Sequence, residues 1–126
     1  MAERKYAIQI SVESRYLSEH SKPEAGRFSF AYTIRITNVG AVPAQLISRH
    51  WIITDAEGKV IEVKGLGVVG QQPLLAPGQS FEYSSGCQLT TPVGSMHGNY
   101  FFVAEDGERF EAPIAEFGLA MPRSLH

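Results

Sequence analysis

The stretch of sequence that decides the fold is "RFSFAYTIRIT", residues 27–37. Every second residue is large and apolar, and the residues between them are mostly polar. Such an alternation is typical of a β-strand with one buried face, because successive side chains of a strand point to opposite sides. The stretch therefore predicts a strand whose buried stripe consists of Phe28, Phe30, Tyr32, Ile34 and Ile36.

The same period of two recurs along the chain. Residues 6–14, "YAIQISVES", place Tyr6, Ile8 and Ile10 on one face. Residues 44–54 and 59–63 are rich in β-branched side chains and flank the turn sequence "DAEG". A second hairpin, beginning at Asn99, is predicted to turn at Asp106-Gly107. These patterns predict about seven strands and no regular helix.

Short antiparallel strands in this number predict an all-β fold, an immunoglobulin-like or fibronectin type III-like β-sandwich of two antiparallel sheets. We expect one domain over residues 1–126, without an internal disulfide because Cys87 is the single cysteine. Trp51 falls on the third strand, where such sandwiches often bury a tryptophan. The predicted core includes Tyr6, Ile8, Ile10, Phe28, Phe30, Tyr32, Ile34, Trp51, Phe81 and Tyr83.

Composition excludes several classes of protein. The net charge is −2, and no run of Lys or Arg extends beyond Arg4-Lys5, which argues against a nucleic-acid binder. No apolar run approaches the roughly 20 residues of a membrane span, so we expect no membrane insertion. The first residues lack the apolar segment of a signal peptide, and a single cysteine is compatible with a reducing compartment. We therefore expect a cytoplasmic location.

The segment "KGLGVVGQQP", residues 64–73, contains the spacing G-x-G-x-x-G of a dinucleotide-binding loop. That loop needs a helix after its third glycine, and Pro73 and Pro77 prevent one here. The favoured interpretation is that Gly65, Gly67 and Gly70 permit positive φ angles or close backbone approach. An anion-binding nest formed by the amides of these glycines stays open as an alternative.

Arg49 is the second candidate binding residue. With a period of two it shares a face with Trp51, so its guanidinium must find a partner or reach the sheet edge. One interpretation is structural, with Arg49 stacked on an aromatic ring or paired with a carboxylate. The other is functional, with Arg49 contacting an anion or a peptide near the glycine segment.

Signals for metal binding, cofactors and catalysis are weak. The chain contains no H-x-H, H-x-x-x-H or C-x-x-C, and no G-x-S-x-G nucleophile elbow. Cys87 is interpreted as a small buried hydrophobe. We expect no metal site, no cofactor and no enzymatic activity. The four histidines are far apart in the sequence, at His20, His50, His97 and His126.

Three motifs together carry a family resemblance: R-H-W-x-I-x-D at residues 49–55, G-x-G-V-V-G-x-x-P at 65–73, and P-G-x-x-F-x-Y-x-S at 77–85. From about Tyr6 to Pro122 the chain resembles the bacterial ApaG family, whose domain also occurs in larger eukaryotic proteins, including F-box proteins and a polymerase-delta-interacting protein. The resemblance implies a fibronectin type III-like sandwich without established catalysis and an association with cobalt and magnesium efflux or resistance. Pyrophosphate binding has been proposed for the family's glycine motif, which falls here on Gly65, Gly67 and Gly70.

The predicted function is therefore a non-enzymatic binding module that engages a protein partner through a sheet edge or its loops. Reuse of the domain in multidomain proteins favours this function. The alternative is a small-ligand binder that recognises a phosphorylated or pyrophosphate compound through residues 65–70. A weak homo-oligomer also stays open.

Overall fold

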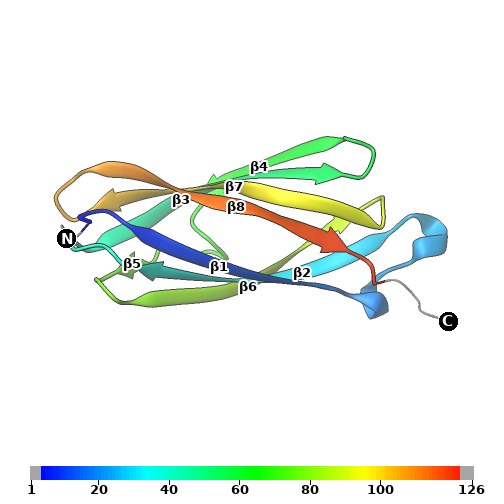
Figure 1. The fold of residues 1–126 in the computed structure, drawn as a ribbon, viewed down its shortest axis with the longest axis horizontal. Coiled ribbons are helices and arrows are strands. Elements are labelled where there is room, and N and C mark those ends of the chain that lie inside the picture. Colours follow the sequence, from blue (N-terminus) through cyan, green and yellow to red (C-terminus); the bar gives the residue numbers. More distant parts are fainter. Residues whose placement is uncertain (1–3, 123–126) are drawn as a thin grey trace.

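The computed structural model describes residues 4–122 and contains two antiparallel sheets packed face to face (Figure 1). The predicted β-sandwich is thus confirmed. One of the four histidines, His126, lies outside the described residues. The strands are β1 (Ile8–Tyr16), β2 (Phe28–Asn38), β3 (Ala44–Asp55), β4 (Val60–Leu66), β5 (Leu74–Leu75), β6 (Ser80–Leu89), β7 (Val93–Ala104) and β8 (Arg109–Ala120). Two short 3-10 turns, η1 (Ser18–His20) and η2 (Pro23–Ala25), join β1 to β2.

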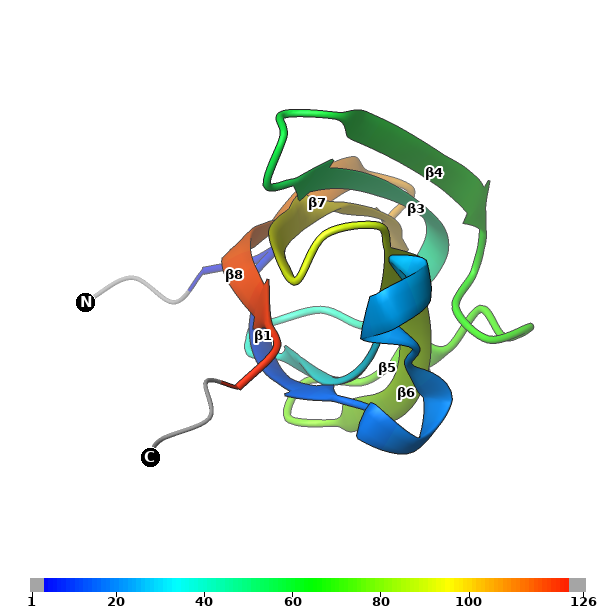
Figure 2. The same ribbon diagram turned by 90° about the vertical axis from the view of Figure 1, so that its right-hand side faces the viewer.

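The two sheets differ in width. One contains three strands in the order β1-β2-β6, and the other runs β4-β3-β7-β8, with the two-residue β5 added to β3. On one side of the sandwich β1 approaches β8, where the Ser14 hydroxyl donates a hydrogen bond of 2.9 Å to the carbonyl of Gly118. On the opposite side the segment between β4 and β5 passes from one sheet towards the other (Figure 2). This connection contains most of the glycine motif.

The core lies between the sheets and follows the predicted stripe of β2. All five apolar residues of that stripe are buried, and the side chain of Trp51 is 2% exposed. Ile8, Ile10 and Phe81 are partly buried and pack against this core. The prediction of about seven strands missed β5, which has only two residues and therefore shows no alternation of apolar and polar side chains. The structure also begins β7 at Val93, six residues before the predicted hairpin, because the small and polar residues there still pair with β3 and β8.

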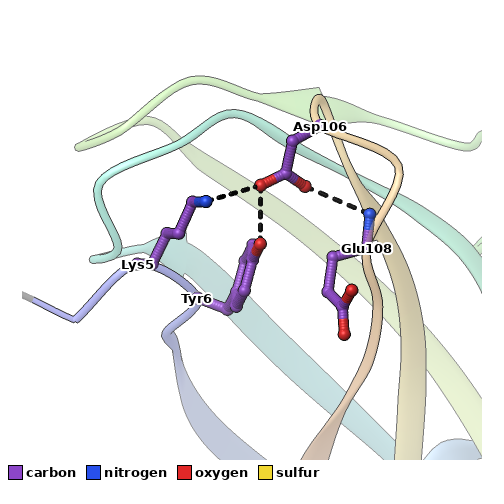
Figure 3. A network of polar contacts seen from close by, with 4 residues as sticks. All are labelled: Lys5, Tyr6, Asp106 and Glu108. Carbon is purple, nitrogen blue, oxygen red and sulfur yellow. Dashed lines mark hydrogen bonds and ion pairs between the residues drawn. The ribbon is translucent and has the colours of Figure 1, made fainter.

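Tyr6 lies outside the core, which corrects its predicted burial. Its hydroxyl donates a hydrogen bond of 2.6 Å to Oδ2 of Asp106, and its ring packs 5.3 Å from that of Phe110. The Lys5 ammonium lies 3.0 Å from the same carboxylate oxygen, while the Glu108 amide donates to Oδ1 (Figure 3). A tyrosine needs a partner for its hydroxyl, and at this end of the sheet Asp106 supplies it. The network ties the segment before β1 to the β7–β8 turn.

This network makes stability depend on pH at acidic values. The Tyr6 hydroxyl, the Glu108 amide and Lys5 lower the pKa of Asp106 from 3.8 to about 2. A carboxyl whose pKa falls on folding stabilises the native state above its unfolded pKa, and this contribution disappears as the pH falls through the folded pKa. We expect the stability difference between the wild type and Asp106→Asn to shrink as the pH is lowered from about 4 to about 2. Thermal unfolding of both proteins across this range checks the expectation, and a constant difference would contradict it.

Candidate functional site

The glycine motif is built around the side chain of Arg49. In the β3–β4 ladder Arg49 lies opposite Gly65, and its Nη1 donates hydrogen bonds to the carbonyls of Leu66 and Gly67, at 3.1 and 2.8 Å. A Cβ atom on Gly65 would lie 2.8–2.9 Å from three guanidinium atoms. Gly65 therefore makes room for Arg49, which in turn holds the chain where it leaves β4.

Gly67 has a separate backbone role. Its φ angle is +63°, and an added Cβ would overlap with the carbonyl oxygen of Gln71. Its amide donates a hydrogen bond of 2.8 Å to the carbonyl of Ile47 on β3. No other residue type combines this φ angle with such a close approach of the backbone at low cost.

A tight turn follows at residues 68–71. Val68 and Gln71 exchange two backbone hydrogen bonds, of 2.8 and 2.9 Å, while Val69 and Gly70 both have positive φ angles. These are the features of a type I′ hairpin turn. The side chain of Val68 is fully buried in the core, whereas Val69 is 54% exposed and holds a φ of +43° that is rare for a β-branched residue.

The predicted site residues thus separate into two groups. Arg49 lies against Gly65 and donates a hydrogen bond to Gly67, so the three residues form one structural unit. Gly70 lies at the turn, where an added Cβ would meet nothing within 4 Å. The structural interpretation of Arg49 expected an aromatic ring or a carboxylate as its partner. Instead, Arg49 donates hydrogen bonds to backbone carbonyls of the glycine segment. Sequence reasoning could not find these acceptors, since carbonyl groups leave no trace in the residue pattern.

Several donors of this segment are occupied within the chain. The amides of Gly67, Val68 and Gln71 donate to backbone carbonyls, and the Arg49 guanidinium also binds carbonyls. A phosphate cradle needs several such donors directed at the ligand. The segment also continues into β5 rather than a helix. The geometry therefore favours a structural role for the motif, and ligand binding by Gly65, Gly67, Gly70 and Arg49 stays a prediction.

Three tyrosines, Tyr32, Tyr83 and Tyr100, are buried in the core. The hydroxyls of Tyr83 and Tyr100 lie 2.5 Å apart. Burial raises the pKa of Tyr83 to about 12 and raises the pKa of Tyr100 further, although Arg49 acts in the opposite direction on both. Burial also raises the pKa of Tyr32. Phenols whose pKa values are raised in this way stay uncharged near pH 7.

Cys87 is likewise not activated. Burial raises its pKa to about 11, and its Sγ lies 3.9 Å from Sδ of Met96. A nucleophilic cysteine needs the opposite shift. Within residues 4–122, no three His, Cys, Asp or Glu side chains form a group that could hold a metal ion. In the same part of the chain no helix has the length and apolar character needed to cross a membrane.

A surface hollow was missed by the sequence analysis. It lies on the outer face of the five-stranded sheet, meaning the face turned away from β1, β2 and β6. A β-bulge between Leu46 and Ser48 leaves Ile47 as an extra residue, and Phe101 and Val103 flank the buried Phe102. The hollow has a volume of about 570 Å³ and is lined by Ile47, Phe101, Phe102, Val103, Arg109, Phe110 and Glu111.

Two smaller hollows adjoin this one. One, of about 410 Å³, shares Phe101 and is also lined by Ser48, Arg49, His50, Lys64, Gly65 and Leu66. The other, of about 530 Å³, shares Val103 and reaches Leu74. Leu66 and Leu74 are 75% and 61% exposed. The run "YFFV" at residues 100–103 was the available signal, because a strand with one solvated face rarely carries apolar residues on both faces.

Comparison with known proteins gives consistent matches. The family model described as the ApaG domain matches residues 18–104. The chain is 66% identical over 127 residues to Protein ApaG of Thiobacillus denitrificans and 55% identical over 126 residues to Protein ApaG of Methylococcus capsulatus, with full coverage of both chains in each case.

A solved structure agrees with these sequence matches. A crystal structure from Bordetella pertussis, described as ApaA, superposes with a TM-score of 0.94 at 61% identity and covers 98% of this chain and 100% of its own. The family model and the full-length relatives indicate the same family as the three sequence motifs. The chain therefore belongs to the ApaG family.

Proposed function

We propose that this chain is a non-enzymatic binding module that works in the cytoplasm and engages a protein partner through the outer face of its five-stranded sheet. The observation that carries the proposal is the apolar hollow around Ile47, Phe101 and Val103, with the exposed leucines beside it. Partly open apolar surface rimmed by charged groups is typical of protein interaction sites. Arg109 and Glu111 form such a rim here.

The chemistry of the interior agrees with a non-enzymatic role. Tyr83, Tyr100 and Cys87 have pKa values raised by burial, the direction that keeps each group uncharged. We also propose that any effect on cobalt or magnesium efflux runs through the protein partner rather than through a metal site in this domain. The alternative, a pyrophosphate binder, has less support because Arg49 and the amides of Gly67, Val68 and Gln71 already have acceptors.

Capture from lysate with matched surface variants tests the proposal. Val103 and Val93 lie at opposite ends of β7, and only Val103 lines the hollow. We expect the wild type and Val93→Glu to capture the same partner and Val103→Glu to lose it, with all three proteins showing the same β-rich far-UV spectrum. A set of captured proteins that does not change with Val103→Glu would contradict the proposal.

A further inference from the structure

The strand β4 forms an open edge of the five-stranded sheet. Among the described residues, β3 is the strand that pairs with it, along residues 60–66. The ladder is framed by hydrogen bonds from the Asp55 amide to the Lys59 carbonyl, at 3.0 Å, and from the Gly67 amide to the Ile47 carbonyl, at 2.8 Å. Because residues of an antiparallel edge strand alternate between facing the neighbour and facing away, every second residue of β4 directs its N–H and C=O groups outward. The outward residues are Val60, Glu62, Lys64 and Leu66.

This edge is also unusually apolar. Val60, Ile61 and Leu66 are 56%, 43% and 75% exposed, although the strand is only seven residues long. An unpaired edge with exposed apolar side chains is a template for a further strand. The sequence of β4 indicates which strand fits.

We propose that β4 pairs antiparallel with β4 of a second copy of this chain, about a two-fold axis that passes through Val63. In this register Glu62 lies opposite Lys64 of the second copy, and Lys64 lies opposite its Glu62. Opposite charges directly across an antiparallel pair stabilise it. The pairing forms two such ion pairs on the outer face, and it uses the backbone groups that β3 leaves free.

The apolar residues are complementary in the same register. Val60 lies opposite Leu66 of the second copy, so two of the exposed apolar side chains cover each other. On the inner face, Ile61 lies opposite Gly65 of the second copy, where the guanidinium of that copy's Arg49 fills the space over the glycine. Val63 lies opposite Val63 of the second copy in a non-hydrogen-bonded pair, the arrangement that brings side chains closest.

The charges of Glu62 and Lys64 favour this register over registers that are shifted along the strand. A shift of the pairing by two residues in either direction places Glu62 opposite Glu62, or Lys64 opposite Lys64, and like charges in these positions are destabilising. A shift by one residue would exchange the two faces of the strand. Charges of one sign would protect an edge against self-pairing, whereas β4 carries one charge of each sign, placed symmetrically about Val63.

The paired edge lies beside the partner-binding surface proposed above and shares Leu66 with it. Dimerisation uses the backbone of β4, whereas the hollow around Phe101 and Val103 lies over β3, β7 and β8. A failure of one proposal therefore leaves the other intact, and the Val103→Glu variant serves as a control for the dimer.

Charge reversal tests the dimer by sedimentation equilibrium over a series of protein concentrations. Glu62→Lys places a lysine opposite Lys64 of the second copy, and Lys64→Glu places a glutamate opposite its Glu62. We expect each variant alone to self-associate at least about tenfold more weakly than the wild type. An equimolar mixture of the two variants restores pairs of opposite charge, so it should form mixed dimers at wild-type strength.

Further variants separate pairing from misfolding. The double variant Glu62→Lys/Lys64→Glu restores both ion pairs within one chain and should dimerise like the wild type. Glu13→Lys makes the same charge change on an exposed position of β1 and should have no effect. A wild type that stays monomeric at every concentration would overturn the proposal. Self-association that is the same in all variants, or that the mixture fails to restore, would also overturn it.

Discussion

Replacing Trp51 by alanine is expected to lower the free energy of unfolding by about 3–5 kcal/mol. The indole is 2% exposed and contacts rings from both sheets, with centroid distances of 5.7 Å to Tyr32, 6.2 Å to Tyr100 and 5.9 Å to Phe117. Its removal would leave a cavity between layers that are held apart by strand backbones and cannot close over it.

Urea unfolding of the two proteins measures this effect, and Ile52→Ala provides the control. Ile52 is the next residue on β3 and faces the outer side of the sheet, where it is only half-buried. Its truncation should cost clearly less than that of Trp51. Equal losses for the two variants would show that the indole is not the central packing element between the sheets.

The second large effect is expected for Gly67→Ala, at about 2 kcal/mol or more. Two costs combine at this position. Alanine must adopt a φ of +63°, and its Cβ would overlap with a backbone oxygen that the turn at residues 68–71 holds in place. Relief of this contact would move Gln71 and disturb the turn that holds Val68 in the core.

Gly70→Ala is the matched control for this prediction. Gly70 also has a positive φ, of +79°, but an added Cβ there meets nothing within 4 Å. It should cost only the conformational penalty, about 1 kcal/mol. Chemical unfolding of both variants distinguishes the two costs, and equal destabilisation would mean that the close approach to Gln71 is unimportant.

The fold could be predicted from the sequence because it depends on a period of two. The stripe of β2, the burial of Trp51 and the turns at residues 55–58 and 106–107 all follow from residue types and their spacing. Tyr6 fits the alternation of β1 but lies outside the core. Alternation predicts on which face of a strand a side chain lies. It does not predict where along the strand the opposite sheet ends.

The candidate site was less predictable for physical reasons. The partners of Arg49 are backbone carbonyls, whose positions depend on the path of the chain after β4. The hollow depends on a bulge at Ile47, a single extra residue that shifts the register of one strand against β7. The position of β4 at the edge of its sheet can be recognised only when the strand order is known. Each feature arises from tertiary pairing rather than from local sequence.

We propose that the glycine motif is a structural element that secures the chain between β4 and β5, and that it does not form a phosphate cradle. Titration of pyrophosphate into protein labelled with ¹⁵N, followed through the amide signals of residues 65–71, tests it most directly. We predict no saturable shift of these signals, because Gly67, Val68 and Gln71 already donate within the chain. Saturable shifts centred on Gly65 to Gly70 at micromolar pyrophosphate, absent in a folded Gly67→Ala variant, would contradict the claim.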